Sequence, residues 1–507
     1  MNIKQAKQEI TNTLKAYLAK DQLGNYLIPT VRQRPVLLMG PPGVGKTQIM
    51  EQIAAETGVG LVAYTITHHT RQSAIGLPFI EKRTYGGEEV SVTEYTMSEI
   101  LSSVYQLMER TGLQEGILFL DEINCVSETL APMMLQFLQC KTFGNQALPE
   151  GWLIVAAGNP PEYNKSVRDF DVVTLDRVKR IDVEEDYGVW KEYARRKNLH
   201  GAILSYLDIK KDNFYRIENT ADGLQFATAR GWEDLSELLY AYETLGIRAD
   251  REVVGQYIQM PRIAKDFANY LEMFYKYQKT YHVEGILSGT WENITVLELR
   301  EAPFDEKLSV MGLVLSRLSE EARNTRCQDA LTDALHTSLT EFREKIADAP
   351  PLTVLDQLLW KRRTAMKQAK EAGQLDKESR DLKQREINAL EDYRQRLDRE
   401  AVAPEGAMDA VRGWFGEEVE RRKAVAMETK DMFDNAFRFL ETTFSDSQEL
   451  VIFVTEITAG YDTSWFVEQF GCDAYFRHNR ELLFDSTRHR IREEIAAAKA
   501  AEQEENT

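Results

Sequence analysis

Short apolar runs alternate with amphipathic helical patterns over about the first 185 residues of the chain. The runs predict buried strands, which we expect at residues 36–39, 61–66, 117–120, 153–157 and 178–183. The helical patterns lie between them and predict helices at residues 48–57, about 97–110 and about 128–139. Because strands alternate with helices, the chain is expected to form a parallel sheet with helices on both faces.

Two parts of the chain depart from this alternation. Residues 68–95 lack helical periodicity and contain three glycines and a proline, which predicts a long insertion, with a hairpin as one form it could take. After about residue 185, helical periodicity dominates to the end. Residues 361–400 carry many charges of both signs, and their irregular leucine spacing favours a helical hairpin over a coiled coil. Residues 496–507 are predicted to be a fraying helix and an acidic tail.

The composition is that of an ordinary globular protein. Of the 507 residues, 43% are hydrophobic and 28% are charged, which excludes wholesale disorder and a membrane-embedded chain. The net charge of −19 opposes broad, sequence-blind binding to nucleic acid or anionic lipid. One basic cluster stands out at residues 361–370, and we interpret it as a solvated helix face.

Three features favour a cytoplasmic location. No apolar stretch approaches the length of a membrane-spanning helix, and the first ten residues are polar and charged, unlike a signal peptide. The cysteines have no paired spacing, so reduced thiols are expected instead of disulfides or a zinc framework. They are Cys125, Cys140, Cys327 and Cys472.

Residues 40–47 read GPPGVGKT and match the pattern GxxxxGK[ST] between a predicted strand and a predicted helix. The glycines allow backbone N–H groups to form a nest for phosphate oxygens, and the following helix adds the positive end of its dipole. Lys46 is expected to bring its charge to the β- and γ-phosphates, and Thr47 its hydroxyl to Mg²⁺. A chance glycine-rich turn is the alternative, which the flanking strand and helix disfavour. The pattern therefore predicts nucleotide binding.

Two further predicted strands end in polar side chains. The sequence ILFLDE at residues 117–122 ends in two carboxylates, and a buried charge there needs a cation or a hydrogen-bonded network. Asp121 suits the Mg²⁺ shell, and Glu122 suits orienting and deprotonating the attacking water. The sequence IVAAGNPP at residues 154–161 places Asn159 where it could hold that water. The alternatives are solvated acids at a strand end and an asparagine that only forms a turn.

Two arginines stand where they could stabilise the transition state of phosphoryl transfer. Arg177 lies in LDRV before the last predicted strand, and Arg230 lies in ATARGWEDLS at a predicted helix start. A guanidinium beside the γ-phosphate can raise the rate by several powers of ten. Each could instead form a surface ion pair, which the residues alone favour. The partners of Arg177 would be Asp176 or Asp182, and Arg230 would pair with Glu233 of its own helix.

The order of GPPGVGKT, ILFLDE, AAGNPP, LDRV and ATARGWEDLS resembles the AAA+ ATPases of the MoxR-like branch over about residues 30–245. The resemblance implies a P-loop αβα sandwich with a five-stranded parallel sheet, followed by an all-helical lid. It also implies a ring, usually a hexamer, with ATP and Mg²⁺ between subunits. The partner of such proteins often contains a von Willebrand factor A domain.

With this resemblance the chain divides into five parts. They are an N-terminal helix and linker (1–34), the ATPase core (35–185), a helical lid (186–290), a helical extension (291–350), and a charged helical hairpin with the C-terminal helices (351–507). The matched motifs end at about residue 245, and the resemblance does not extend past about residue 290. It therefore implies no function for the long helical extension that follows.

The resemblance assigns a role to each matched position. The nucleotide-binding residues are Gly40, Pro41, Pro42, Gly43, Val44, Gly45, Lys46, Thr47 and Gln48. The residues expected to hold Mg²⁺ are Thr47 and Asp121. The expected catalytic residues are Glu122, Asn159, Arg177 and Arg230.

Three of these catalytic residues carry family names. Asn159 matches sensor 1, Arg177 the arginine finger offered to the neighbouring subunit, and Arg230 sensor 2 on the lid. Arg168 and Arg180 are the alternatives for the finger.

Two insertions of the family also have counterparts in the chain. Residues 68–95 and about 142–151 fit an insertion in the second helix and a hairpin before sensor 1. The pair His68-His69 falls in the first insertion, and we interpret it as surface or packing residues and not as a metal site.

The predicted function is an ATP-driven, chaperone-like remodeller of a protein partner, by family analogy. A nucleic-acid-directed motor is an alternative that the acidic charge and the absence of a recognisable DNA-binding module disfavour. A nucleotide-gated scaffold with slow hydrolysis is the other alternative. ATP in preference to GTP is implied by the resemblance, because base-contacting residues cannot be read from the sequence.

Overall fold

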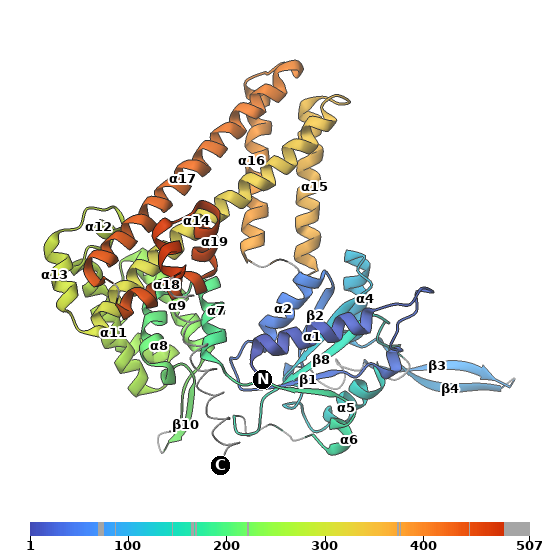
Figure 1. The fold of residues 1–507 in the computed structure, drawn as a ribbon. Helices are drawn as coiled ribbons and strands as arrows, with labels where there is room; N and C mark the ends of the chain where they lie inside the picture. Colours follow the sequence, from blue (N-terminus) through green and yellow to red (C-terminus); the bar gives the residue numbers. More distant parts are fainter. Residues whose placement is uncertain are drawn as a thin grey trace, which may run out of the picture. The chain divides into compact units, whose positions relative to one another are not determined.

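A computed structural model describes residues 1–68, 76–86, 88–143, 146–163, 167, 170–220, 223–372, 375, 377–445 and 447–480 (Figure 1). These residues form two compact units. The first unit is Met1–Val189 with Asp348–Gln395, and the second is Trp190–Ala347 with the described residues from Arg396 onwards. The tail predicted at residues 496–507 lies outside the described residues.

A five-stranded parallel sheet forms the centre of the first unit, which confirms the predicted fold class. Its strands are β1 (Val36–Met39), β2 (Gly60–Thr65), β5 (Gly116–Asp121), β8 (Trp152–Gly158) and β9 (Lys179–Asp182). They pair in the order β2-β5-β8-β1-β9, each pair parallel. The carboxyl ends of all five strands therefore share one edge of the sheet, and β1 lies beside β8 there.

Helices cover both faces of this sheet, because nearly every side chain of its central strands is apolar and buried. On one face lie α1 (Ile3–Leu18) and α2 (Lys46–Thr57). On the other face lie α4 (Glu99–Thr111) and α5 (Ala131–Cys140). Two 3₁₀ turns, η1 (Thr30–Arg32) and η2 (Ile66–His68), and a short helix, α6 (Val172–Leu175), complete this αβα sandwich.

Both predicted insertions contain an antiparallel hairpin. The first consists of β3 (Pro78–Tyr85) and β4 (Glu88–Tyr95), and it extends away from the sheet (Figure 1). The second consists of β6 (Thr142–Phe143) and β7 (Gln146–Ala147). Side chains of the first hairpin are exposed almost throughout, so burial contributes little to its stability.

A buried lysine joins the end of α5 to the segment before β1. Lys141 follows α5 in the left-handed conformation, with φ of 57°, and its side chain is buried. Its Nζ donates a hydrogen bond to the carbonyl oxygen of Thr30 at 3.0 Å. Burial lowers the pKa of Lys141 to about 8, because an apolar surrounding disfavours the charged ammonium.

The predicted charged hairpin belongs to the first unit. It consists of α15 (Pro351–Glu371), which packs against α4, and α16 (Lys377–Arg399). Arginines and carboxylates pair across the hairpin, and these pairs are Arg362–Glu386, Arg363–Glu391 and Arg394–Asp356. Acidic residues of α16 therefore offset part of the basic cluster, as expected of a solvated helix face.

The second unit is mainly helical. Its longest helices, α14 (Phe304–Lys345) and α17 (Ala407–Phe444), pack against each other. The other named helices are α7 (Tyr187–Arg196), α8 (Gly201–Ile209), α9 (Ala229–Leu245), α10 (Arg251–Tyr257), α11 (Pro261–Thr280), α12 (Val283–Leu287), α13 (Asn293–Glu301), α18 (Gln448–Ala459) and α19 (Tyr461–Phe470), with 3₁₀ turns η3 (Lys211–Asn213) and η4 (Pro404–Gly406). Among the described residues, no helix has both the length and the apolar character needed to cross a bilayer.

One hairpin interrupts the segment that is predicted to be an all-helical lid. It consists of β10 (Arg216–Thr220) and β11 (Gly223–Ala227), paired antiparallel. The prediction is wrong in this respect, because strands this short show too few alternations to stand out from the helical periodicity around them.

A buried ionic cluster fastens α18 to the start of the second unit. Glu456 accepts from Lys191 at 2.9 Å and also from Arg195, and all three side chains are largely buried. Burial works to raise the pKa of Glu456, but the two cations outweigh it and hold that pKa below its usual value. Glu456 is therefore ionised at neutral pH.

Candidate functional site

The loop between β1 and α2 forms a turn that needs its glycines. Gly43 and Gly45 have φ of 80° and 92°, in the left-handed region that side chains disfavour. Gly40 packs so closely on the chain after β9 that a Cβ there would lie 2.9 Å from the carbonyl oxygen of Val183. The first turn of α2 follows directly, so backbone N–H groups of the loop and the helix face the same space.

Lys46 lies inside this loop, with only 8% of its surface exposed. Its Nζ donates to the carbonyl oxygens of Gly40 at 2.6 Å and Pro41 at 2.9 Å, and to Oδ1 of Asn159 at 2.8 Å. The structure thus brings together Lys46 and Asn159, which lie 113 positions apart in the sequence. These oxygens hold the ammonium at the position where phosphate oxygens could replace them.

The carboxylates that follow β5 lie beside the first turn of α2. The hydroxyl of Thr47 donates to Oδ2 of Asp121 at 3.0 Å. A hydroxyl and a carboxylate are the oxygen ligands that Mg²⁺ takes together with phosphate oxygens and water. Among the described residues there is no cluster of three His, Cys, Asp or Glu side chains that could hold a metal ion.

The backbone conformation of Glu122 and a hydrogen bond from a threonine fix the position of its carboxylate. Its φ of 57° lies in the left-handed region, where few non-glycine residues are found. Its N–H donates to Oδ1 of Asp121 at 2.9 Å, and its Oε2 accepts from the hydroxyl of Thr67 at 2.8 Å. The carboxylate is therefore oriented by a residue of η2, the turn that follows β2.

Sequence reasoning missed two residues of this site, Thr67 and Asn124. Thr67 follows β2, whose register with β5 places Thr65 opposite Asp121. Asn124 donates from Nδ2 to the carbonyl oxygen of Asn159 at 2.8 Å and so positions the chain after β8. Each of them is a polar residue shortly after a predicted strand, and this could have marked it as a candidate. Which site such a residue reaches, however, depends on which strands are neighbours in the sheet.

Arg177 is exposed, between α6 and β9. One of its Nη atoms donates to the side-chain oxygen of Gln139 in α5, and among the described residues it forms no ion pair with Asp176 or Asp182. Arg180 instead contacts Asp182 at 2.8 Å, and Arg168 lies outside the described residues.

Arg230 is exposed in the first turn of α9, in the second unit. Within the described part of the chain it has no ion pair, and the carboxylate of Glu233 accepts a hydrogen bond from Tyr193 instead. Burial raises the pKa of Asp234, and the charge of Arg230 opposes this. The ion pair with Glu233, the alternative to the sensor 2 role, is therefore not formed among the described residues.

The other predicted residues of the loop and of the first insertion follow the chain positions expected of them. Pro41, Pro42, Val44 and Gln48 lie in the loop and the first turn of α2, as their sequence position requires. Of the pair His68-His69, His69 lies outside the described residues.

Comparisons with known proteins agree with this geometry over part of the chain. Residues 35–178 match the family model for the AAA domain of the dynein-related subfamily. A solved structure of a "putative ATPase" from Cytophaga hutchinsonii matches with 17% identity and a TM-score of 0.22, over 36% of this chain and 52% of that chain. The match thus spans about half of that protein, and a likeness this low adds nothing to the fold described above. The comparison with curated proteins gave no match.

Residues 35–178 therefore form an AAA-type P-loop domain. Such a domain implies a bound nucleotide, usually with Mg²⁺.

Proposed function

We propose that the chain is a Mg²⁺-dependent ATP hydrolase of the MoxR-like AAA+ type, which acts as a ring to remodel or mature a protein partner. The observation that carries the proposal is the contact between Lys46 of the glycine-rich loop and Asn159, which follows β8, with Thr47 and Asp121 in contact beside it. The match to the AAA domain supports the nucleotide-binding part. The MoxR-like assignment rests on the order of the sequence motifs.

The residues divide the work of hydrolysis among themselves. The loop's N–H groups and Lys46 bind and orient the phosphates, because they present positive charge at the carboxyl edge of the sheet. Asn159 lies against Lys46, where its amide can hold the attacking water. Glu122 takes a proton from that water, and Thr67 keeps its carboxylate aimed. Thr47 and Asp121 would hold Mg²⁺, which would supply charge neutralisation to the β- and γ-phosphates.

In a ring, Arg177 would complete the site of the neighbouring subunit. It is exposed, and its one described partner is a neutral amide, so an incoming phosphate could displace that contact at low cost. Arg230 would approach the nucleotide from the lid. The expected ring is hexameric, and a partner with a von Willebrand factor A domain is the expected client, both by family analogy.

The two other functions are less well supported. A nucleic-acid motor would use the basic cluster of α15, but Arg362 and Arg363 are paired with carboxylates of α16. A nucleotide-gated scaffold would have no need for Glu122 to be held by both its backbone and Thr67.

Steady-state ATP hydrolysis and mass photometry on wild type, Arg177→Ala and Arg110→Ala test the proposal. Arg110 is an exposed arginine at the end of α4 and serves as a matched control. We expect an ATP-dependent ring in all three, and turnover at least about tenfold slower in Arg177→Ala alone, because a finger arginine is worth several powers of ten. Hydrolysis by a wild-type monomer, with Arg177→Ala unaffected, would contradict both the ring and the finger.

A further inference from the structure

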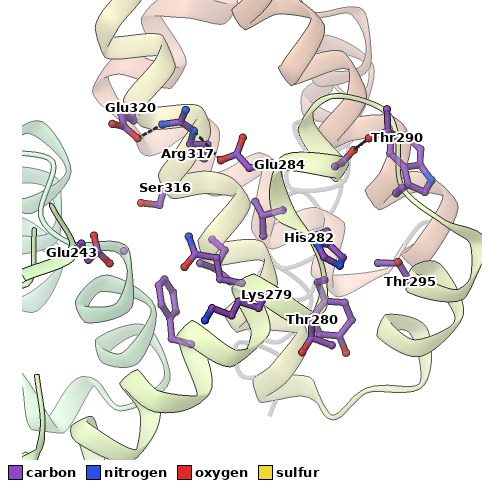
Figure 2. Close-up of a pocket in the computed structure, with 18 of the residues that line it drawn as sticks. Glu243, Lys279, Thr280, His282, Glu284, Thr290, Thr295, Ser316, Arg317 and Glu320 are labelled. Atoms are coloured by element: carbon purple, nitrogen blue, oxygen red, sulfur yellow. Dashed lines mark hydrogen bonds and ion pairs between the residues drawn. The ribbon is translucent and has the colours of Figure 1, made fainter. Parts of the chain in front are cut away.

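A pocket of about 990 Å³ opens in the second unit, and its lining contains none of the residues that the proposed hydrolysis uses (Figure 2). Helices α8, α9, α11, α13 and α14 and the segment around α12 contribute its walls. Buried residues such as His200, Phe274 and Leu313 line its inner part, and charged and hydroxyl side chains line its rim. The pocket is thus deep enough for one long side chain and open enough for the chain that carries it.

The lining carries an excess of negative charge. Its glutamates are Glu243, Glu284, Glu292, Glu298 and Glu320, whereas its lysine and arginine are Lys279 and Arg317. Arg317 is already surrounded, because it contacts Glu284 at 3.4 Å, Glu320 at 2.6 Å and Glu321 of the same helix at 2.9 Å. Figure 2 shows the first two of these contacts on one wall. Within the described residues, Glu292 and Glu298 form no ion pair.

A buried histidine fixes one of these carboxylates. His200 is the N-cap of α8, and its Nδ1 accepts from the N–H of Ala202 at 3.2 Å. Its Nε2 therefore carries the proton and donates to Oε1 of Glu243 at 2.9 Å. Burial works to raise the pKa of Glu243, but hydrogen bonds from His200 and Tyr275 outweigh it and keep that pKa below its usual value. Glu243 thus stays ionised at neutral pH.

An aromatic ring, Tyr240, lines the pocket together with Glu243 and Glu320. Tyr240 packs against the imidazole of His200, with ring centroids 5.0 Å apart, and keeps 36% of its surface exposed. Burial and then the negative charges of Glu320 and Glu243 raise its pKa, while Arg323 opposes them. An exposed aromatic ring flanked by carboxylates from two helices is the surrounding that a guanidinium or an ammonium group prefers.

We propose that this pocket binds an arginine or lysine side chain of a protein partner, with the cation over Tyr240 and between Glu243 and Glu320. The rim points to a polypeptide and not to a free polyamine. Two apolar side chains of α13 are exposed there: Ile294 has 53% of its surface accessible and Leu297 has 54%. Ile294 also lines the pocket itself. In a bound polypeptide, apolar residues next to the arginine or lysine would cover Ile294 and Leu297, whereas a polyamine has no such side chains.

The test is fluorescence polarisation with the full chain and a short labelled peptide of glycine, serine, leucine and arginine. A second peptide has citrulline, which is neutral, in place of arginine. We expect binding of the arginine peptide, with Kd raised about fivefold or more by Glu320→Gln, Glu243→Gln or Tyr240→Ala, since each removes one partly desolvated cation contact. Glu243→Gln keeps an acceptor for His200, so the fold of α8 is preserved.

Glu272→Gln is the matched control, because Glu272 is an exposed glutamate of α11 that does not line the pocket. It should change Kd by less than about twofold, as expected for a distant charge that salt screens. Equal binding of the citrulline peptide, or an equal loss in Glu272→Gln, would overturn the proposal. Displacement of the peptide by spermidine at a lower concentration than by unlabelled peptide would also overturn it and assign the pocket to a small polycation. None of these measurements needs ATP, so their result is independent of the proposed hydrolysis.

Discussion

Replacing Lys141 with methionine should stabilise the first unit at neutral pH, although it removes a hydrogen bond. The lysine is buried at the end of α5, and its ammonium has one described partner, the carbonyl oxygen of Thr30. Methionine has a similar length and no charge to bury. Both residues lack the freedom of glycine, so the left-handed backbone at this position costs the same in both.

The magnitude follows from the pKa. Burial lowers the pKa of Lys141 from 10.5 to about 8, and a difference of this size corresponds to about 3 kcal/mol. The unfolded chain keeps the proton up to pH near 10.5 and the folded unit releases it near pH 8. The folded unit therefore binds fewer protons between these values, and its stability rises with pH there. The full cost of about 3 kcal/mol applies below pH 8.

Urea denaturation of wild type and Lys141→Met measures this effect. At pH near 7 the variant should be more stable by about 2 kcal/mol, because the lost hydrogen bond to Thr30 offsets about 1 kcal/mol of the gain. At pH about 9.5 that advantage should fall by about 2 kcal/mol, since wild type then loses most of its penalty. Lys141→Arg keeps the charge and is expected to be less stable than wild type, increasingly so at the higher pH. An advantage of Lys141→Met that is the same at both pH values would falsify the assignment of the low pKa.

Two further predictions concern the site and the second unit. Thr67→Val should lower kcat for ATP hydrolysis about tenfold with little change in KM. The reason is that a hydrogen bond to a carboxylate contributes about 1.5–3 kcal/mol, and this one orients Glu122. An unchanged kcat would show that Thr67 has no positioning role. Glu456→Gln should destabilise the second unit by about 3 kcal/mol at neutral pH, because it removes the carboxylate of Arg195 and leaves Lys191 with Asp208 alone. The pKa of Glu456 is lower in the folded unit than its value of 4.5 in the unfolded chain, so its contribution to the stability of the unit is fully present above pH 4.5. That contribution is lost as pH falls through the folded pKa. The urea midpoints of wild type and variant should therefore converge in acid.

Local sequence patterns were sufficient to predict where the residues at the ends of β1, β5 and β8 lie. Each lies where an apolar run meets a polar or glycine-rich loop, and in a parallel sheet those points meet at one edge. The contact of Lys46 with Asn159 follows from that geometry once β1 and β8 are neighbours.

Contacts that depend on the order of the strands could not be predicted in the same way. Thr67 reaches Glu122 only because β2 pairs with β5, and no local pattern encodes that pairing. For Arg177 the alternative to the finger was an ion pair with a nearby acid in the sequence, but α5 brings Gln139 to it from 38 positions away. Side chains that are supplied by another element are therefore the part of the site that a single sequence does not reveal.

The membership of α15 and α16 in the first unit has a consequence for synthesis on the ribosome. The first unit is interrupted by Trp190–Ala347, so α4 is made long before the helix that packs against it. At roughly 5–20 residues per second, the interval between the end of α4 and the end of α15 lasts roughly 10–50 seconds. During that time the surface that α15 later covers is open to solvent and to chaperones. The nucleotide-binding unit is therefore finished only after Trp190–Ala347 has been made, and a nascent chain released before Pro351 would carry its sheet and loop without this cover.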